Sequence, residues 1–168
     1  MGVGRSARPL RPLYTEEQRA RRDATPWTMI QGVLAPLQFV VFLVSLALVV
    51  RFLATGLGYE LATFSVITKT LILYLIMVTG AIWEQRVFGQ YLFASAFYWE
   101  DVFSMAVLGA HTVYLIAVLG SFGTPALQMT LALAAYGLYL INAGQFLWKF
   151  RQARLQGAST PDAAGVHG

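Results

Sequence analysis

Two stretches of this sequence contain no acidic or basic side chain and are long enough to cross a lipid bilayer. Residues 24–50 contain no Lys, Arg, Asp or Glu, and neither do residues 102–148. A bilayer core about 30 Å thick needs about 20 helical residues, so the first stretch has room for one span and the second for two. A further apolar stretch, residues 61–83, contains Lys69 as its one charge. The sequence therefore predicts an all-α integral membrane four-helix bundle.

Glycine and proline mark the breaks between the predicted spans. Gly56 and Gly58 predict a turn after the first span, and Thr124 and Pro125 have the residue types of an N-cap and a first helical position. The four spans are expected near residues 30–50, 61–83, 102–121 and 125–148.

These spans form a predicted transmembrane domain of residues 24–150. Residues 1–23 are expected to be a basic tail with a short juxtamembrane helix, because Thr15 and Gln18 have the spacing of a capping box. Residues 151–168 are expected to be a disordered tail.

Basic residues are concentrated on one side of the predicted membrane. Ten of the 12 Lys and Arg residues lie in residues 1–23, in residues 84–101 or from Lys149 onward, whereas Arg51 alone lies on the opposite side. The positive-inside rule then places this connector and both termini in the cytoplasm. Basic ends on so apolar a chain favour attraction to lipid headgroups, so we expect the bilayer as a partner and no nucleic acid.

The connector at residues 84–101 combines carboxyl and aromatic groups. Its acids are Glu84, Glu100 and Asp101, and its aromatics between 88 and 99 are Phe88, Tyr91, Phe93, Phe97, Tyr98 and Trp99. A carboxyl group that aromatic rings remove from water favours its protonated form and can donate a proton near neutral pH. The alternatives are interfacial carboxylates in water and an aromatic belt at the headgroups.

Polar side chains within the spans are spaced so that they share helix faces. They are Gln31, Gln38 and Ser45 in the first span, Glu100, Ser104 and His111 in the third, and Tyr139, Asn142 and Gln145 in the fourth. Three of these stripes converge toward the cytoplasmic half, which predicts a polar cavity open to that side. The alternative is that these groups hydrogen-bond neighbouring helices.

Two ionisable residues lie deeper in the membrane. His111 can bind a metal, relay a proton or be satisfied by a neighbouring helix. His167, the other histidine, lies in the tail, which argues against a haem held by two histidines. We expect Lys69 to extend toward the far face of the membrane. The absence of cysteine excludes disulfides, thiolate metal sites and a cysteine nucleophile.

The chain resembles the 3-vinyl (bacterio)chlorophyllide hydratase family of bacteriochlorophyll biosynthesis over residues 14–154. Several short sequence motifs carry this resemblance, in the same order and with the same spacing. The residues that carry the resemblance are Arg22-Asp23-Ala24-Thr25-Pro26-Trp27, Gln31-Gly32-Val33-Leu34-Ala35-Pro36, Thr79-Gly80-Ala81-Ile82-Trp83-Glu84, Phe88-Gly89 with Tyr91-Leu92-Phe93, Trp99-Glu100-Asp101-Val102-Phe103-Ser104, and Asn142-Ala143 with Gln145-Phe146.

The resemblance implies that water adds across the 3-vinyl group of a chlorophyllide and gives a 3-(1-hydroxyethyl) product. It implies a magnesium tetrapyrrole as substrate, no cofactor, a location in the bacterial inner or intracytoplasmic photosynthetic membrane, and other pigment-biosynthesis enzymes as possible partners. A rival function is a non-catalytic pigment carrier or assembly factor, which needs a similar cavity but no proton donor. A small transporter is a poorer match, because paired broken helices are absent from the sequence pattern.

The residues suggest a division of roles for this hydration. We expect Glu84 or Glu100 as the general acid and Asp101 as its partner or base. His111 is expected either to ligate the magnesium of the substrate or to orient the water, and no metal site of the protein itself is expected. Hydrogen bonds to the pigment are expected from Gln31, Gln38, Ser104, Asn142 and Gln145, and ring contacts from Tyr91, Phe93, Phe97, Tyr98 and Trp99.

Overall fold

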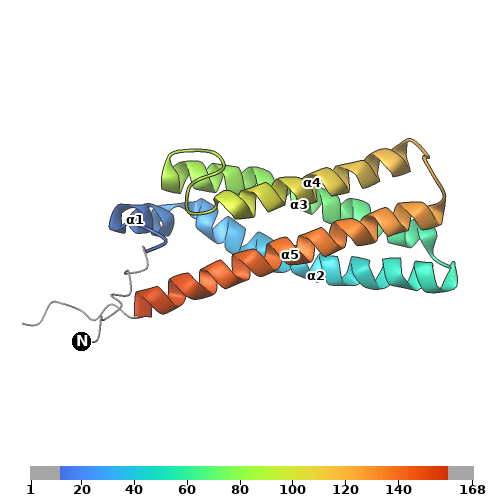
Figure 1. The fold of residues 1–168 in the computed structure, drawn as a ribbon, viewed down its shortest axis with the longest axis horizontal. Helices are drawn as coiled ribbons and strands as arrows, with labels where there is room; N and C mark the ends of the chain where they lie inside the picture. The colour runs from blue at the N-terminus through green and yellow to red at the C-terminus, as the bar shows by residue number, and fades with distance from the viewer. Residues whose placement is uncertain (1–11, 159–168) are drawn as a thin grey trace, which may run out of the picture.

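The chain folds into five helices, of which four form an elongated bundle (Figure 1). The structure is a computed structural model that describes residues 12–158. Its elements are α1 (Glu16–Ala24), α2 (Pro26–Thr55), α3 (Tyr59–Phe88), α4 (Tyr98–Leu119) and α5 (Pro125–Ala158). The four helices from α2 onward are long and apolar enough to cross a membrane, and no strand occurs between residues 12 and 158. The predicted all-α, four-span architecture is confirmed.

The helices are longer than the predicted spans. The helix α3 continues to Phe88 and α4 already begins at Tyr98, so Glu84, Glu100 and Asp101 lie on helices and only residues 89–97 form the connecting loop. Glycine ends α3, since Gly89 takes the left-handed conformation with φ 84°.

The N-terminal end of the described chain agrees with the prediction, whereas the C-terminal end is more helical than expected. The predicted capping box is present, with Thr15 as the N-cap of α1 and Gln18 completing it. The last helix, α5, runs on to Ala158, so helix occupies the first part of the segment that we expected to be disordered. The predictions for residues 1–11 and 159–168, which include His167, lie outside the described residues.

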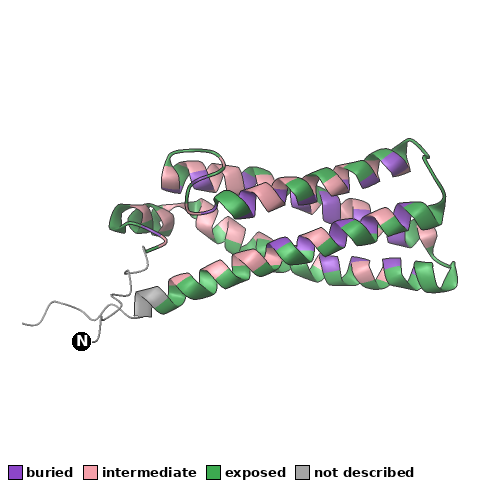
Figure 2. Ribbon diagram, in the orientation of Figure 1, coloured by how far each residue is buried: buried purple, intermediate pink, exposed green. Residues whose placement is uncertain are grey.

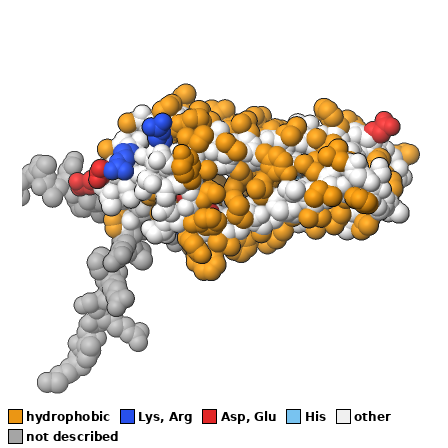
Figure 3. Space-filling view, turned by 90° about the horizontal axis from the view of Figure 1, so that it is seen from above, with side chains coloured by type: hydrophobic (Ala, Val, Ile, Leu, Met, Phe, Trp, Pro, Cys, Tyr) orange, Lys and Arg blue, Asp and Glu red, His pale blue; other side chains and the backbone are white. Residues whose placement is uncertain are grey.

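The bundle is built from two closely packed helix pairs, α2 with α3 and α4 with α5. Buried residues line the inside of the bundle while its outer faces are exposed (Figure 2). The flank that Figure 3 shows is covered by apolar side chains, and basic side chains gather at one end of it. An apolar outside with a polar end is the arrangement expected when lipid surrounds the helices.

Hydrogen bonds between helices hold the polar residues of the interior. The Gln31 side-chain amide donates to Thr79 Oγ1 at 2.7 Å, and Ser45 Oγ lies 2.6 Å from the hydroxyl of Tyr136. For Gln31 and Ser45, the structure therefore agrees with the alternative that such groups bond neighbouring helices. The loop 89–97 and α1 lie at the same end of the bundle as the C-terminal part of α5 (Figure 1).

Candidate active site

Two carboxyl groups meet at the end of the bundle where α3 and α4 are joined. Glu84 lies in the last turns of α3 and Asp101 in the first turn of α4, with 5% and 4% of their surfaces exposed. Their side chains lie within interaction distance of each other. Two carboxylates in contact and removed from water repel each other, so the pair favours holding one proton between them. The pair is therefore suited to keep a proton in a site largely closed to water.

The loop 89–97 folds directly over this acid pair. The backbone N–H of Phe93 donates to Asp101 Oδ2 at 2.7 Å, and the N–H of Ala94 donates to Glu84 Oε2 at 3.3 Å. Phe93 has φ 60°, in the left-handed region that residues other than glycine rarely adopt. A strained residue held by a carboxylate beside a buried acid pair is the kind of local conformation that functional sites retain.

Glu100 takes a different partner from its neighbour Asp101. Its carboxylate accepts a hydrogen bond from Lys149 Nζ of α5 at 2.6 Å, and it is 8% exposed. Adjacent positions on a helix point about 100° apart, which is why Glu100 faces α5 while Asp101 faces α3. The three predicted acids are thus separated into a pair of adjoining carboxyls and an ion pair. Lys149 was not predicted as a site residue, because its position at the end of the last span resembles an ordinary basic flank.

Amide groups inside the bundle have unused hydrogen-bonding capacity. Asn142 on α5 donates to Ser104 Oγ on α4 at 2.9 Å, which brings two predicted site residues together. The side-chain carbonyl oxygens of Asn142, Gln145 and Gln38 are buried without a hydrogen-bond partner. Buried acceptors usually have a partner, so these oxygens suit a donor such as water or a ligand N–H or O–H group. The Gln31 side chain, in contrast, already has a partner, because its amide N–H donates to Thr79 Oγ1.

The aromatic residues of the predicted connector divide into an inner and an outer set. Phe97 is 1% exposed and packs against Phe88, Trp83 and Phe146. The outer set is exposed on the loop and the start of α4, and consists of Tyr91, Phe93, Tyr98 and Trp99. The inner ring therefore supports the loop, and the outer rings present an apolar surface beside the acid pair.

The segment before α1 completes the inner aromatic cluster. The Tyr14 ring stacks on Phe88 with a centroid separation of 5.9 Å and lies 6.4 Å from the Phe97 ring. Burial raises the pKa of the Tyr14 hydroxyl to about 12, with Arg22 beside it acting in the opposite direction. Tyr14 therefore stays neutral near pH 7 and serves as a packing residue. No pattern in the sequence singled it out.

The deepest ionisable residues form a second polar cluster within the bundle. Lys69 Nζ lies 2.9 Å from His111 Nε2, and His111 Nδ1 lies 2.8 Å from the carbonyl oxygen of Val107. Both side chains are 0% exposed, and the Lys69 nitrogen is 3.9 Å from the centroid of the Tyr139 ring. The expectation that Lys69 extends to the far face is wrong, because His111 and the aromatic face of Tyr139 satisfy it inside the bundle.

This arrangement bears on the predicted role of His111. Both of its ring nitrogens are occupied, and the ring lies within the packed interior. Ligation of a magnesium ion by His111 would require Lys69 to give up its hydrogen bond, so that role stays a prediction. Within residues 12–158 no group of three or more His, Asp or Glu side chains is placed to hold a metal ion.

These features define a four-span integral membrane protein with a cluster of buried carboxyl groups at one end of its bundle. The family model of 2-vinyl bacteriochlorophyllide hydratase matches residues 14–152. A 2-vinyl bacteriochlorophyllide hydratase of Rhodobacter capsulatus is 70% identical over 148 residues, which are 88% of this chain and 85% of that protein. One of Cereibacter sphaeroides is 67% identical over 150 residues, 89% of this chain and 92% of that protein.

The chain belongs to the 2-vinyl bacteriochlorophyllide hydratase family. The resemblance seen in the sequence is thereby confirmed, although the two names number the vinyl position differently. No solved structure matches the chain.

Proposed function

We propose that this protein adds water to the vinyl group of a bacteriochlorophyllide or chlorophyllide, and that the proton comes from the Glu84–Asp101 pair. Family membership supports the reaction, since the relatives are named for it. The single observation that supports the mechanism is the contact between two buried carboxyls under the loop 89–97, because two such groups favour sharing one proton over both being ionised. Hydration of an alkene needs a proton donor of this kind and no net oxidation or reduction.

The proposed reaction balances within the acid pair and one water molecule. The protonated carboxyl transfers its proton to the terminal vinyl carbon, the C=C π electrons form the new C–H bond, and a cation remains on the carbon next to the macrocycle. The macrocycle delocalises that charge, and water attacks the same carbon. The proton released by the water returns to the carboxylate, so the pair ends as it began and the product is a 1-hydroxyethyl group.

The loop 89–97 is proposed to open so that the vinyl group can reach this proton. Two backbone donors, Phe93 N–H and Ala94 N–H, connect the loop to the acids, and opening would also release the strained φ of Phe93. Both carboxyls would then become accessible together. The outer aromatic rings, Tyr91 and Trp99 among them, would cover the flat macrocycle from the loop side.

The remaining polar groups have supporting roles in the proposal. The carboxylate of Glu100, paired with Lys149, contributes negative charge near the developing cation. The unpaired amide oxygens of Gln38, Asn142 and Gln145 accept hydrogen bonds from the attacking water or from polar pigment substituents. Ser104 positions Asn142.

We expect the site to lie at the cytoplasmic surface of the membrane. The end of the bundle where the loop 89–97 joins α3 to α4 also carries α1 (Figure 1). Most of the Lys and Arg residues between 12 and 158 lie in α1, in the last turn of α3 or toward the C-terminal end of α5. The positive-inside rule makes this end cytoplasmic in a bacterial inner or intracytoplasmic membrane, with both termini on the same side. A pigment arriving from a preceding enzyme, or leaving to a following one, would then enter from the cytoplasm.

Expression in a host without this pathway tests the reaction. Membranes carrying the full chain are incubated with chlorophyllide, and the extracted pigments are separated by chromatography. We expect a product heavier by one water, with a shifted absorption spectrum because the vinyl group has left the conjugated system. Pigment that binds to these membranes but is recovered unchanged would instead support the carrier function.

A further inference from the structure

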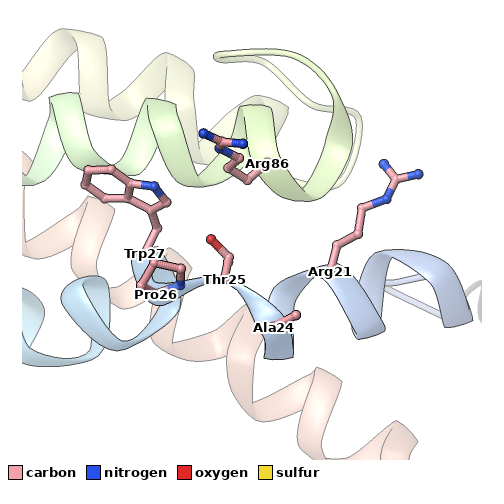
Figure 4. Close-up of a pocket in the computed structure, with 6 residues that line it drawn as sticks. All are labelled: Arg21, Ala24, Thr25, Pro26, Trp27 and Arg86. Carbon is pink, nitrogen blue, oxygen red and sulfur yellow. The ribbon is translucent and has the colours of Figure 1, made fainter.

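An open pocket lies where α1, α2 and α3 meet, at the basic end of the bundle (Figure 4). Its volume is about 440 Å³, and its walls are formed by Arg21, Ala24, Thr25, Pro26, Trp27 and Arg86. The two arginines come from different helices, Arg21 from α1 and Arg86 from α3 (Figure 4). The acid pair is not among the residues of this pocket, and the hydration mechanism does not use it.

The pocket has an excess of positive charge. Arg21 is paired with Glu17 one turn earlier on α1, while Arg86 forms no ion pair or hydrogen bond with the residues between 12 and 155. The nearby carboxylate of Asp23 is engaged by Arg22 at 2.7 Å. No acidic side chain lines the pocket. Arg86 can donate paired hydrogen bonds to an oxyanion, and Arg21 keeps N–H donors beyond the one that Glu17 accepts from, so the two together favour an oxyanion ligand.

The surroundings of the pocket suit a lipid. Trp27 forms part of its wall and lies in the first turn of α2, where tryptophan commonly marks the headgroup level of a membrane helix. Away from the pocket, exposed apolar side chains follow on both neighbouring helices, Met29 and Val33 on α2 and Leu75 and Val78 on α3. These residues offer acyl chains an apolar surface that begins beside the charged pocket.

We propose that this pocket binds the phosphate headgroup of an anionic phospholipid, whose acyl chains lie along α2 and α3. A carboxylate of the pigment has similar chemistry but a less suitable position. Arg86 follows Glu84 by two residues on α3, so the two side chains point about 200° apart around the helix. A flat pigment with its vinyl group at the acid pair would have to bend around α3 to reach Arg86.

Such a lipid would connect α1 to the rest of the bundle. Arg21 lies on α1 and Arg86 on α3, and a shared headgroup would draw the two helices together. The chain just before α1 carries Tyr14, which packs on the aromatic cluster under the loop 89–97. The bound lipid would therefore help to hold the cover of the acid pair in place.

Lipid binding to the full-length protein tests the proposal without any pigment. Native mass spectrometry of the protein in detergent would measure the binding of dioleoyl phosphatidylglycerol and, as the neutral reference, dioleoyl phosphatidylcholine. We expect one phosphatidylglycerol to bind in preference to phosphatidylcholine. Each arginine near a membrane surface contributes about fivefold to anionic-lipid binding, so Arg21→Gln and Arg86→Gln should each weaken it about fivefold and the double variant about 30-fold.

Matched variants separate this pocket from general basic charge. Arg151→Gln removes an exposed arginine from α5 and should leave binding unchanged, and Arg86→Lys should retain most of it. Equal phosphatidylglycerol binding by the wild type and the double variant would overturn the proposal, as would an equal loss in Arg151→Gln. Displacement of the lipid by free chlorophyllide, but not by its methyl ester, would assign the pocket to the pigment and overturn the lipid assignment. Because lipid binding is measured without turnover, neither result depends on the hydratase proposal.

Discussion

Replacing Glu84 by glutamine removes the stored proton while keeping the shape of the site. The new amide oxygen can still accept the hydrogen bond from the Ala94 N–H, and the amide nitrogen can donate to Asp101. The loop therefore keeps its anchor, and the free energy of unfolding should change by about 1 kcal/mol or less. The bond between positions 84 and 101 no longer contains a transferable proton.

The loss of activity should be large because proton transfer to carbon is the proposed first step. A positioned general acid contributes about 10²–10⁴-fold to a reaction rate. Since each factor of ten equals about 1.4 kcal/mol, Glu84→Gln should raise the activation free energy by about 3–5 kcal/mol. Asp101→Asn should have an effect of similar size, because its amide oxygen can still accept from the Phe93 N–H but cannot share a proton.

The double variant distinguishes a shared proton from two separate contributions. When two residues act as one unit, removing either one already abolishes their joint function. The turnover rate of the double variant Glu84→Gln with Asp101→Asn should therefore lie within a few-fold of that of the less active single variant. Turnover is measured in membranes by chromatography of the extracted pigments, at equal amounts of folded protein. Glu60→Gln, which changes an exposed carboxyl in the first turn of α3, is the matched control and should keep full activity. Wild-type turnover in Glu84→Gln, or a double variant whose loss is the product of the two single losses, would refute the shared-proton mechanism.

Three further variants test the structure around the site. His111→Leu should lower the free energy of unfolding by about 1–3 kcal/mol, because it leaves the buried Lys69 nitrogen without its hydrogen-bond partner. Adding Lys69→Met to this variant should recover part of the loss, as measured by thermal unfolding. Phe97→Ala should lower the free energy of unfolding by about 3–5 kcal/mol, because it removes a buried ring. Trp99→Ala should leave the free energy of unfolding almost unchanged and raise KM for the pigment. A larger loss of stability in Trp99→Ala than in Phe97→Ala would contradict the assignment of inner and outer rings. Gly89→Ala should lower the free energy of unfolding by about 1–2 kcal/mol, because alanine is strained at φ 84° even though a Cβ there meets no other atom within 4 Å. Unchanged stability would show that α3 does not need a left-handed residue at its end.

The sequence by itself determined the four spans and the chemical inventory of the site. Membrane helices can be identified from uncharged stretches that are long enough to cross a bilayer. This works because each residue adds its own free energy of transfer into lipid, whatever its neighbours in the folded structure are. The helical repeat also placed Glu100 and Ser104 on one face, and both are buried within the bundle. The spacing of local strings was enough to indicate the family.

Only the tertiary structure decided which of these groups are partners. The sequence treats Glu84 and Glu100 as equal candidates for the acid, but the loop 89–97 brings Glu84 to Asp101 while α5 brings Lys149 to Glu100. The same holds for Lys69, which the structure pairs with His111. Membrane helices are apolar on nearly every face, so the sequence sets their positions along the membrane normal far better than their rotation about their own axes. That rotation, fixed by packing against neighbouring helices, decides which polar side chains meet.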